Sequence, residues 1–510
     1  MKKKVIAVMM TMCLAMTGLA GCGSSADNGG TAETSTNSST EGENVAEKEA
    51  VDLTFIYPTS GTMEGEDQVA EEISKLAKEQ LNVNLTVKPM SIVDCVSNIS
   101  LMIAGGESVD IFPVWAMNIT TFVNSGYVLD LSDYLDNMPN SLQWVGRDDI
   151  ACCNLDGYIW GVTTMRERCN PQGIEMRLDI LNELGIDPES IKTWDDITDV
   201  FAKVKEAYPD MVILSGAQTE GIGNATDMAL TCDPLNDELG VLENYGEELS
   251  VVNEFETEYW TSLMKQVREW YNAGYISKDM ATNSDSGAIL MAAGNLFAFP
   301  DNYKPNTAAE KKSQTGYDLY CVHLTEPMRH TTSVSGLGYA VSGVTEHPDR
   351  AVEVLDWLFG SSEVNDLMNF GVEGQDWVEN EEGTASFPEG KDASSVSYHL
   401  DWGWAIPNQF VGHLWEGNDL DLYQQYEDFK NSAKISKAYG FVFDSSSVED
   451  EEIACKAVLD EYIPAITTGS LDPDTAIAEM NKKLYDAGLQ TIMDEKQKQL
   501  DAWASENNVE

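Results

Sequence analysis

Basic side chains are scarce in this sequence. Its 31 Lys and Arg residues stand against 86 Asp and Glu, which gives a formal net charge of -55. A surface this negative repels phosphate backbones and offers no basic stripe, so nucleic acid is excluded as a partner. The charge also disfavours an anionic ligand drawn in by long-range attraction, unless a local arginine pocket overrides the repulsion. Solubility at a crowded surface is the simpler explanation for so many acids, ahead of selection for a neutral solute.

Sequence motifs for catalysis are missing as well. The five histidines, at positions 323, 330, 347, 399 and 413, show no paired spacing. The sequence has no H-E-x-x-H, no G-x-S-x-G and no P-loop, and Gly221-Ile222-Gly223 lacks the third glycine of a phosphate-binding loop. Two carboxylates suffice for glycoside hydrolysis, however, so a secreted glycosidase stays open as an alternative.

Cysteine is rare, and its spacing argues against metal and redox sites. Seven cysteines follow Cys22, an odd number that cannot all pair, and none stands in a C-x-x-C spacing or beside His at zinc-site spacing. We expect no cofactor and no metal, and we expect most of these thiols to be small buried apolar residues. They are Cys95, Cys152, Cys153, Cys169, Cys232, Cys321 and Cys455.

Only one long apolar run is present, from Val5 to Ala20 after three lysines. It is too short and too interrupted to span a membrane comfortably, which predicts a signal peptide over residues 1–21 and an exported chain. The run ends in Leu19-Ala20-Gly21-Cys22, which resembles the lipobox of bacterial lipoproteins. The resemblance implies cleavage before Cys22 and a diacylglyceryl group with palmitate-type chains on its sulfur. The mature chain would then sit on the extracellular face of a bacterial cell membrane, that of a Gram-positive organism, held by the lipid alone.

Large apolar side chains are nearly absent from the segment that follows. From Gly23 to Ala50 the sequence consists mostly of Gly, Ser, Thr, Asn and Glu, so residues 22–50 are expected to form a disordered tether behind the lipidated cysteine. The folded body begins at Val51. Its length of about 460 residues is too great for one small core and favours two lobes.

Alternating and helical periods indicate an α/β fold. A strand is expected from Leu53 to Tyr57, a helix with Val69 and Ile73 on its buried face, and a second strand from Val83 to Val87. A helix near residues 99–104 and a strand over residues 109–112 continue the alternation. This order predicts parallel strands with helices on both faces of the sheet.

Later helices carry clear boundary signals. Thr193 and Asp196 form a capping-box-like start, and Pro348 opens a helix that Gly360 closes. The end of the chain is expected to be helical over residues 473–485 and 489–503.

Several stretches, in this order, resemble the extracellular solute-binding proteins of family 1, the sugar-binding subunits of ABC importers that include maltodextrin-binding protein. The resemblance covers the whole predicted mature chain, and the last stretches resemble a lipoprotein subgroup with an uncharacterised C-terminal extension. One departure is Thr163, where the family usually has Pro. The stretches are residues 101–107 with Asp110-Ile111, 126–131, 156–162, 177–181 with 184–186, 270–276, 365–374, 487–489 and 497–500.

The resemblance implies two α/β lobes joined by crossing strands, with the ligand in the cleft between them. The crossings are expected near Val162, Gly338 and Trp402. Lobe 1 would then comprise residues 51–163 and 334–400. Lobe 2 would comprise residues 164–333 and 401–510, the latter with the helical extension.

A sugar site needs flat aromatic platforms beside planar hydrogen-bonding groups. Loops that follow predicted strands supply both, and the positions of Trp115 and Tyr303 resemble those of aromatic ligand platforms in maltodextrin-binding protein. In Trp402-Gly403-Trp404, an extended chain would place both indoles on one face. Arg166 and Arg168 have the chemistry to bond hydroxyls or a carboxylate, although pairing with surface acids is the commoner role. The candidate ligand-binding residues are Tyr57, Trp115, Asn118, Arg166, Asn302, Tyr303, Trp402, Trp404 and Asn408.

The sequence therefore predicts a substrate-binding lipoprotein that captures an extracellular carbohydrate, an oligosaccharide above all, and delivers it to the permease subunits of an ABC importer. A secreted glycoside-active enzyme and a binder of some other solute are the alternatives. A passive adhesin or scaffold would not need a hinged two-lobe body.

Overall fold

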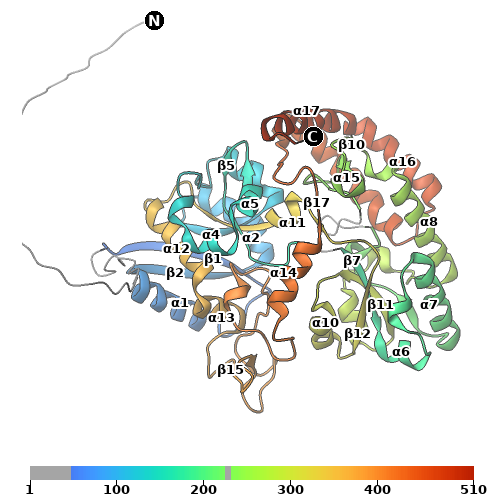
Figure 1. Ribbon diagram of the computed structural model, residues 1–510, viewed down its shortest axis with the longest axis horizontal. Helices are drawn as coiled ribbons and strands as arrows, with labels where there is room; N and C mark the ends of the chain where they lie inside the picture. The colour runs from blue at the N-terminus through green and yellow to red at the C-terminus, as the bar shows by residue number, and fades with distance from the viewer. Residues whose placement is uncertain (1–47, 170, 224–230, 510) are drawn as a thin grey trace, which may run out of the picture. The chain divides into compact units, whose positions relative to one another are not determined.

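The computed structural model describes residues 48–169, 171–223 and 231–509. The predicted signal peptide, Cys22 and nearly all of the predicted tether lie outside these residues. Residues 48–510 form one compact unit by their contacts, and the two-lobed α/β architecture expected from the sequence is confirmed within it (Figure 1). None of the described helices is both long enough and apolar enough to cross a membrane.

Lobe 1 is built on a five-stranded sheet in the order β2-β1-β3-β14-β6. Strands β1, β2 and β3 are parallel, as predicted, whereas β14 runs antiparallel to both β3 and β6. The sheet is therefore mixed. The strands are β1 (Val51–Thr59), β2 (Val83–Ser91), β3 (Ile111–Trp115), β14 (Leu337–Val341) and β6 (Val162–Thr163).

Helices cover both faces of this sheet, as the sequence predicts. Helix α1 (Glu66–Leu81) buries its predicted face, Val69 and Ile73, in the same cluster as Phe55 of β1. Helix α2 (Ile92–Ala104) packs on the opposite face, with Ile56 of β1. Neighbouring residues of one strand thus enter different cores, because successive side chains of a strand point to opposite faces. Helices α12 (Pro348–Gly360) and α13 (Ser362–Phe370) complete the α1 side.

Lobe 2 is built on a four-stranded sheet in the order β12-β7-β11-β8. Strand β7 is antiparallel to its two neighbours, and β8 is parallel to β11. The predicted capping box is confirmed at α7 (Trp194–Ala207), where Thr193 and Asp196 bond each other's backbone N–H. The other elements are β7 (Gln172–Arg177), β8 (Val212–Leu214), β11 (Leu296–Asn302), β12 (Leu319–His323) and α8 (Glu258–Ala273).

The C-terminal helices belong to the core of lobe 2. Helices α16 (Pro473–Ala487) and α17 (Leu489–Asn507) confirm the two predicted ones, and α15 (Glu449–Thr467) precedes them. All three contribute to the hydrophobic cluster that also holds α7, α8 and β11. Buried polar groups reinforce this packing, since Lys496 of α17 is ion-paired with Asp237 while both side chains are nearly inaccessible. The extension is thus a structural part of lobe 2.

Shorter elements connect these units. They are α3 (Ile119–Asn124), α4 (Pro139–Trp144), α5 (Arg147–Ile150), β4 (Asn154–Leu155), β5 (Tyr158–Ile159), α6 (Leu178–Glu183), β9 (Val241–Leu242), β10 (Val251–Val252), α9 (Gly287–Ala292), α10 (Thr307–Thr315), β13 (Met328–Arg329), α11 (Thr331–Ser335), β15 (Val378–Glu379), β16 (Ala385–Ser386), α14 (Leu422–Ser432) and β17 (Lys434–Ile435).

The first two connections between the lobes lie side by side, because Thr163 at the end of β6 pairs with Gly338 of β14. The third connection comes later than the sequence predicts. Asn408 donates to the Phe359 carbonyl (2.8 Å), and the backbone N–H of His413 donates to Asp366 (2.8 Å), so residues 401–416 remain on lobe 1. The chain crosses instead through the segment that leads into α14, which Figure 1 shows in the middle of the molecule.

A buried charge cluster lies beside these connections. Asp149 of α5 in lobe 1 is ion-paired with Arg168 of the first connection and with Arg329 of β13 (2.5 Å). It also accepts a hydrogen bond from Tyr439, which comes from the C-terminal extension (2.5 Å). The Asp149 carboxylate of lobe 1 therefore binds three other segments: the first connection, β13 and the C-terminal extension. Of the two roles considered for Arg168, the structure shows pairing with an acid, because the side chain is fully buried in this cluster and ion-paired with Asp149.

All seven cysteines that follow Cys22 are free and buried, as the sequence predicts. Burial raises the pKa of Cys95 and Cys152 to about 12. These thiols therefore stay protonated at neutral pH and act as small packing residues.

Candidate functional site

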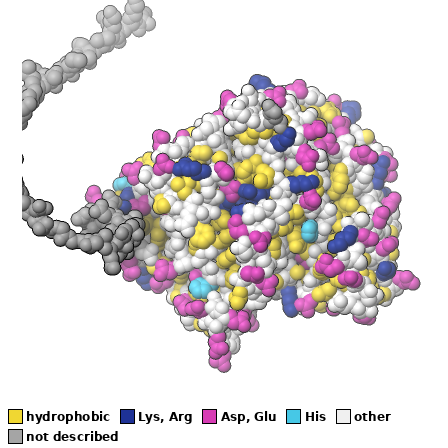
Figure 2. Space-filling model, in the orientation of Figure 1, with side chains coloured by type: hydrophobic (Ala, Val, Ile, Leu, Met, Phe, Trp, Pro, Cys, Tyr) yellow, Lys and Arg dark blue, Asp and Glu magenta, His cyan; other side chains and the backbone are white. Residues whose placement is uncertain are grey.

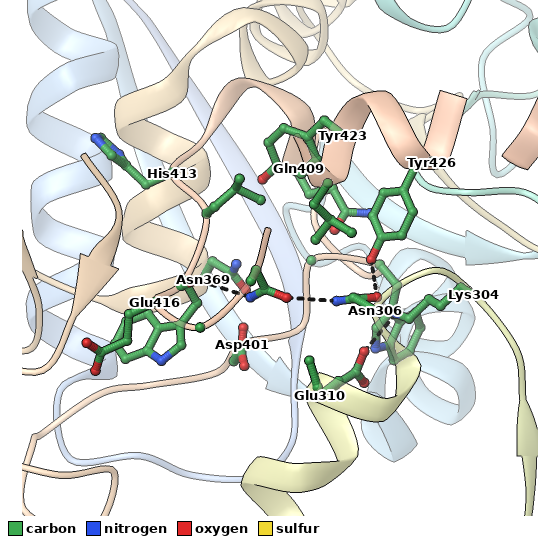
Figure 3. Close-up of a pocket in the computed structure, with 18 of the residues that line it drawn as sticks. Lys304, Asn306, Glu310, Asn369, Asp401, Gln409, His413, Glu416, Tyr423 and Tyr426 are labelled. Carbon is green, nitrogen blue, oxygen red and sulfur yellow. Dashed lines mark hydrogen bonds and ion pairs between the residues drawn. The ribbon is translucent and has the colours of Figure 1, made fainter. Parts of the chain in front are cut away.

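A cavity of about 470 Å³ lies where lobe 1, lobe 2 and α14 meet (Figure 3). One wall comes from the loop after β11 and from α10, in lobe 2. The opposite wall comes from the end of α13 and from residues 401–418. Helix α14 supplies the rest through Leu422, Tyr423 and Tyr426. The volume of the cavity falls within the usual range for small-molecule sites, about 300–1,000 Å³.

The first wall is placed by the strand order of lobe 2. Strand β11 ends at Asn302, and the chain turns at its carboxyl end into Lys304, Asn306 and then α10. Ligands of open α/β sheets bind at the carboxyl ends of strands, where the loops face a crevice. The cavity therefore occupies the position at which this fold usually places a ligand.

Aromatic side chains line much of the cavity. Trp415 packs against Phe370, with ring centroids 5.1 Å apart. Tyr423 stacks on Phe410 at 4.8 Å, and only part of its ring is covered. Such rings offer flat apolar faces that match the C–H faces of sugar rings. The aromatic residues of the lining are Phe370, Trp404, Trp415, Tyr423 and Tyr426.

Amide side chains stand between these rings. Asn306 donates to Asn418 (3.3 Å) and accepts a hydrogen bond from the Tyr426 hydroxyl (2.5 Å), which links the lobe 2 loop to α14. Asn369 differs from these, because its side-chain oxygen is buried and has no hydrogen-bond partner among the described residues. Asn369 is 8% exposed and lies on the cavity wall. An unsatisfied buried acceptor of this kind is costly unless a ligand or water bonds to it.

The Trp402-Gly403-Trp404 segment differs from its predicted geometry. It forms a turn in which the Ala405 N–H donates to the Trp402 carbonyl (2.8 Å), so it is not extended. Trp402 packs against the core of lobe 1, whereas Trp404 faces the cavity. The predicted extended geometry is therefore wrong, although the two rings still lie together, with centroids 5.4 Å apart. Gly403 lets the Gln409 side chain approach closely, and a Cβ at this position would force the end of that side chain to move.

Charged groups of the cavity form local pairs. Lys304 bonds Glu310 (2.9 Å), Lys312 bonds Asp318 (2.6 Å), and His413 bonds Asp366 (2.7 Å). Burial favours the neutral form of Glu310, but the adjacent Lys304 outweighs it and lowers the pKa of that carboxyl. Two carboxylates of the lining, Asp401 and Glu416, have no cationic partner within 4.0 Å among the described residues.

Two predicted ligand contacts are wrong, because the side chains are buried in lobe 1. Tyr57 is fully buried, and its hydroxyl bonds that of Tyr398 (3.2 Å). Asn408 is also fully buried and caps the turn that follows it. Both residues bond to distant segments, Tyr57 to Tyr398 and Asn408 to the Phe359 carbonyl.

The remaining candidates lie near the cleft but do not line this cavity, except for Trp404. Tyr303 stacks on His323 at 4.0 Å, and Asn302 is the last residue of β11, paired with Gln172. Trp115 is half-buried at the end of β3, and Asn118 immediately precedes α3. Arg166 bonds the Ser333 carbonyl (3.2 Å) within the paired connections.

Most residues of the cavity lining were not among the ligand-binding residues predicted from the sequence. Trp415 is held in place by two backbone hydrogen bonds, which join Leu414 and Glu416 to Ala385 of β16. Asn369 lies in the last turn of α13, where the local sequence does not indicate that its side chain points into a cavity. Among the described residues, no group of three or more His, Cys, Asp or Glu side chains is arranged to hold a metal ion.

Comparison with known families shows to which class of protein the chain belongs. Residues 72–372, more than half of the chain, match the family described as bacterial extracellular solute-binding protein. The chain belongs to this family. Residues 437–505 match a second family, described only as a domain of unknown function (DUF3502), and they correspond to the extension that packs into lobe 2.

Individual solute-binding proteins resemble the chain over most of its length. A carbohydrate ABC transporter substrate-binding protein of Streptococcus pneumoniae is 24% identical over 446 residues, covering 85% of this chain and 87% of the relative. The crystal structure of the N-glycan transport solute binding protein NgtS from the same species has a TM-score of 0.78 and 21% identity, covering 90% of this chain and 99% of that one. Its complex with Man5GlcNAc has a TM-score of 0.70 and 22% identity, covering 91% and 100%. These relatives are transport binding proteins.

Proposed function

We propose that this chain is the substrate-binding subunit of an ABC importer and that it captures an oligosaccharide in the cavity between its lobes, without acting as an enzyme. The observation that carries the proposal is the lining itself. The lining combines aromatic faces with amide groups, and the buried side-chain oxygen of Asn369 has no hydrogen-bond partner among the described residues. Sugars present the complementary surface of C–H faces and hydroxyl rims.

The relatives narrow the ligand class. The curated relative is a carbohydrate transporter subunit, and NgtS has been crystallised with Man1GlcNAc and Man5GlcNAc. We therefore take oligosaccharides of mannose and N-acetylglucosamine as the first ligands to test. Membrane permease subunits would receive the sugar from the closed protein.

A glycan panel tests this function. The full chain is heated with each oligosaccharide, and the melting temperature is compared with that of the protein alone. A true ligand at 100 times its Kd stabilises the fold by about 2.7 kcal/mol, which raises the melting temperature measurably. Chromatography of the same samples should recover the glycan intact. Stabilisation by no member of the panel, or release of shorter sugars, would refute the proposal.

Ligand binding should also bring the lobes together, because a cavity with walls from both lobes gains contacts when it closes. Small-angle scattering of the full chain is expected to give a smaller radius of gyration with saturating oligosaccharide than without it. A non-binding disaccharide is the control. If a ligand that stabilises the protein left the radius of gyration unchanged, the prediction that the lobes close on the ligand would be wrong.

For the N-terminal segment we propose a lipid anchor at Cys22, on the outer face of the cell membrane of a Gram-positive bacterium. The Leu-Ala-Gly-Cys pattern after a lysine-rich apolar run supports it. Two acyl chains on one cysteine are enough for stable attachment, whereas one chain binds only marginally.

The anchor predicts the behaviour of Cys22→Ala. Cells that express this variant should release the protein into the medium or retain the uncut precursor, and labelled palmitate should be absent from it. Cys95→Ala serves as the matched control and should be labelled and retained like the parent. Normal retention of a cut, unlabelled Cys22→Ala protein would rule the anchor out.

A further inference from the structure

The charges of the cavity are arranged unevenly. Its two lysines are both paired, Lys304 with Glu310 and Lys312 with Asp318, while Asp401 and Glu416 lack a cationic partner. In the view of Figure 3, Asp401 lies between Glu416 and the Lys304–Glu310 pair. A ligand in this cavity therefore meets two carboxylates that form no ion pair, and no available positive group, within the described lining. Burial raises the pKa of Asp401 to about 6, so this carboxyl is mostly ionised at neutral pH.

From this arrangement we infer that the cavity selects uncharged oligosaccharides and rejects acidic ones, with Asp401 and Glu416 as the residues that repel a sugar carboxylate. The inference rests on the proposed function and adds to it the charge class of the ligand. Carboxylate-bearing sugars, such as those with uronic or sialic acid residues, would be excluded.

Recognition of a carboxylate normally uses arginine, whose planar fork donates two parallel hydrogen bonds. No arginine lines the cavity within the described part of the chain. The two arginines of the first connection are engaged elsewhere, Arg166 with the Ser333 carbonyl and Arg168 with Asp149. The local arginine pocket that would override the negative charge of the chain is thus missing from this cavity.

Lys304 is a poor substitute for such an arginine. Only 13% of its side chain is exposed, and its ammonium group is held 2.9 Å from Glu310. A sugar carboxylate that took this ammonium group would have to compete with the Glu310 carboxylate for it in a partly buried place, which is unfavourable. Lys312 is more exposed, but it is turned to Asp318.

Long-range electrostatics act in the same direction. The chain carries a formal net charge of -55, and acidic side chains are spread over the face seen in Figure 2. Such a field lowers the local concentration of anions and slows their association, an effect that salt screens. Neutral sugars are not affected by it.

The test uses one oligosaccharide in three forms. Man5GlcNAc is used unmodified, with the primary alcohols of its rings oxidised to carboxylates, and with those carboxylates converted to primary carboxamides. The last two forms are nearly equal in size and shape, and they differ in charge. Rings whose C6 oxygen forms a glycosidic bond have no free primary alcohol and stay unchanged, so the changed group is carried by the other rings, which include the terminal ones. Affinities are measured by calorimetry with the full chain at near-neutral pH and low salt.

We expect the carboxylate form to bind at least about tenfold more weakly than the carboxamide form, in keeping with repulsion between charges a few ångströms apart near a surface. The ratio of the two affinities should shrink several-fold in Asp401→Asn with Glu416→Gln, and again at high salt. The matched control is Asp419→Asn with Asp421→Asn, which removes two charges just outside the lining and should leave the ratio nearly unchanged.

The possible outcomes distinguish a failure of the charge selection from a failure of the oligosaccharide-binding function. Equal binding of the carboxylate and carboxamide forms, or tighter binding of the carboxylate, would overturn the charge selection while the oligosaccharide function stood. A ratio unchanged by the double substitution would overturn the assignment to Asp401 and Glu416. If none of the three forms bound, the mannose-type ligand and this inference would both fall.

Discussion

Replacing Trp404 with alanine is expected to weaken oligosaccharide binding by roughly 5- to 150-fold, which corresponds to about 1–3 kcal/mol for the loss of one aromatic anchor. The indole lies on the cavity wall and is only partly covered by protein. Its removal therefore takes away a ligand surface and little of the core. Calorimetric titration with the glycan that stabilises the parent measures the loss, and the melting temperature should change by only a few degrees.

Trp402→Ala is the matched control, because it removes the same side chain two residues away. Trp402 packs against the core of lobe 1, so its loss should lower the melting temperature more than Trp404→Ala does. The two rings touch, with centroids 5.4 Å apart, so some affinity is also expected to be lost. A larger effect of Trp402→Ala on affinity and of Trp404→Ala on stability would reverse these assignments.

The second large effect is expected from the charge cluster at the connections. In Asp149→Ala, Arg168 and Arg329 lose their common carboxylate although Arg168 has no access to water. Breaking a buried pair in this way costs about 3–5 kcal/mol, since it leaves uncompensated charge inside the protein. Urea unfolding of the full chain should show a midpoint far below that of the parent. Asp136→Ala, which removes the exposed partner of Arg147, is the control and should change the midpoint little.

The same cluster makes a prediction about acid. Burial on its own favours the neutral form of Asp149, but Arg168 and Arg329 outweigh it and hold the pKa of this carboxyl below its usual value. A lowered folded pKa contributes stability that is fully present above the unfolded value, about 3.9, and is lost as the pH falls through the folded one. The difference in unfolding free energy between the parent and Asp149→Asn should therefore be constant near neutral pH and shrink below about pH 4. A difference that grew on acidification would contradict this sign.

Local sequence signals predicted the elements of this fold well. The buried face of α1, the capping box of α7 and the two last helices each depend on residues within one or two helical turns, and the structure confirms them. Helix α15 was not predicted. It contains Pro464 in its interior, and its apolar residues are only weakly gathered on one face, so neither of the usual signals was available.

The candidate site was harder to predict, because distant segments determine which side chains are exposed. Tyr57 ends buried since Tyr398, from a segment more than 300 residues later, covers it. Asn408 is fixed by the Phe359 carbonyl, and the segment before it forms a turn in which Trp402 packs against the lobe 1 core while Trp404 lines the cavity. Trp404 was predicted from the spacing of two indoles around a glycine, and it does line the cavity although the segment is a turn and not extended. Asn369 was missed because an asparagine on a helix has no pattern that shows where its amide points.

The central claim is that an oligosaccharide binds in the cavity between the lobes, and a crystal structure of the chain with Man5GlcNAc tests it most directly. The account predicts a sugar ring stacked on Trp404, with a hydroxyl within hydrogen-bond distance of the Asn369 side-chain oxygen and the lobes closer together. A glycan bound elsewhere, with this cavity filled only by water and Asn369 left without a sugar partner, would contradict it.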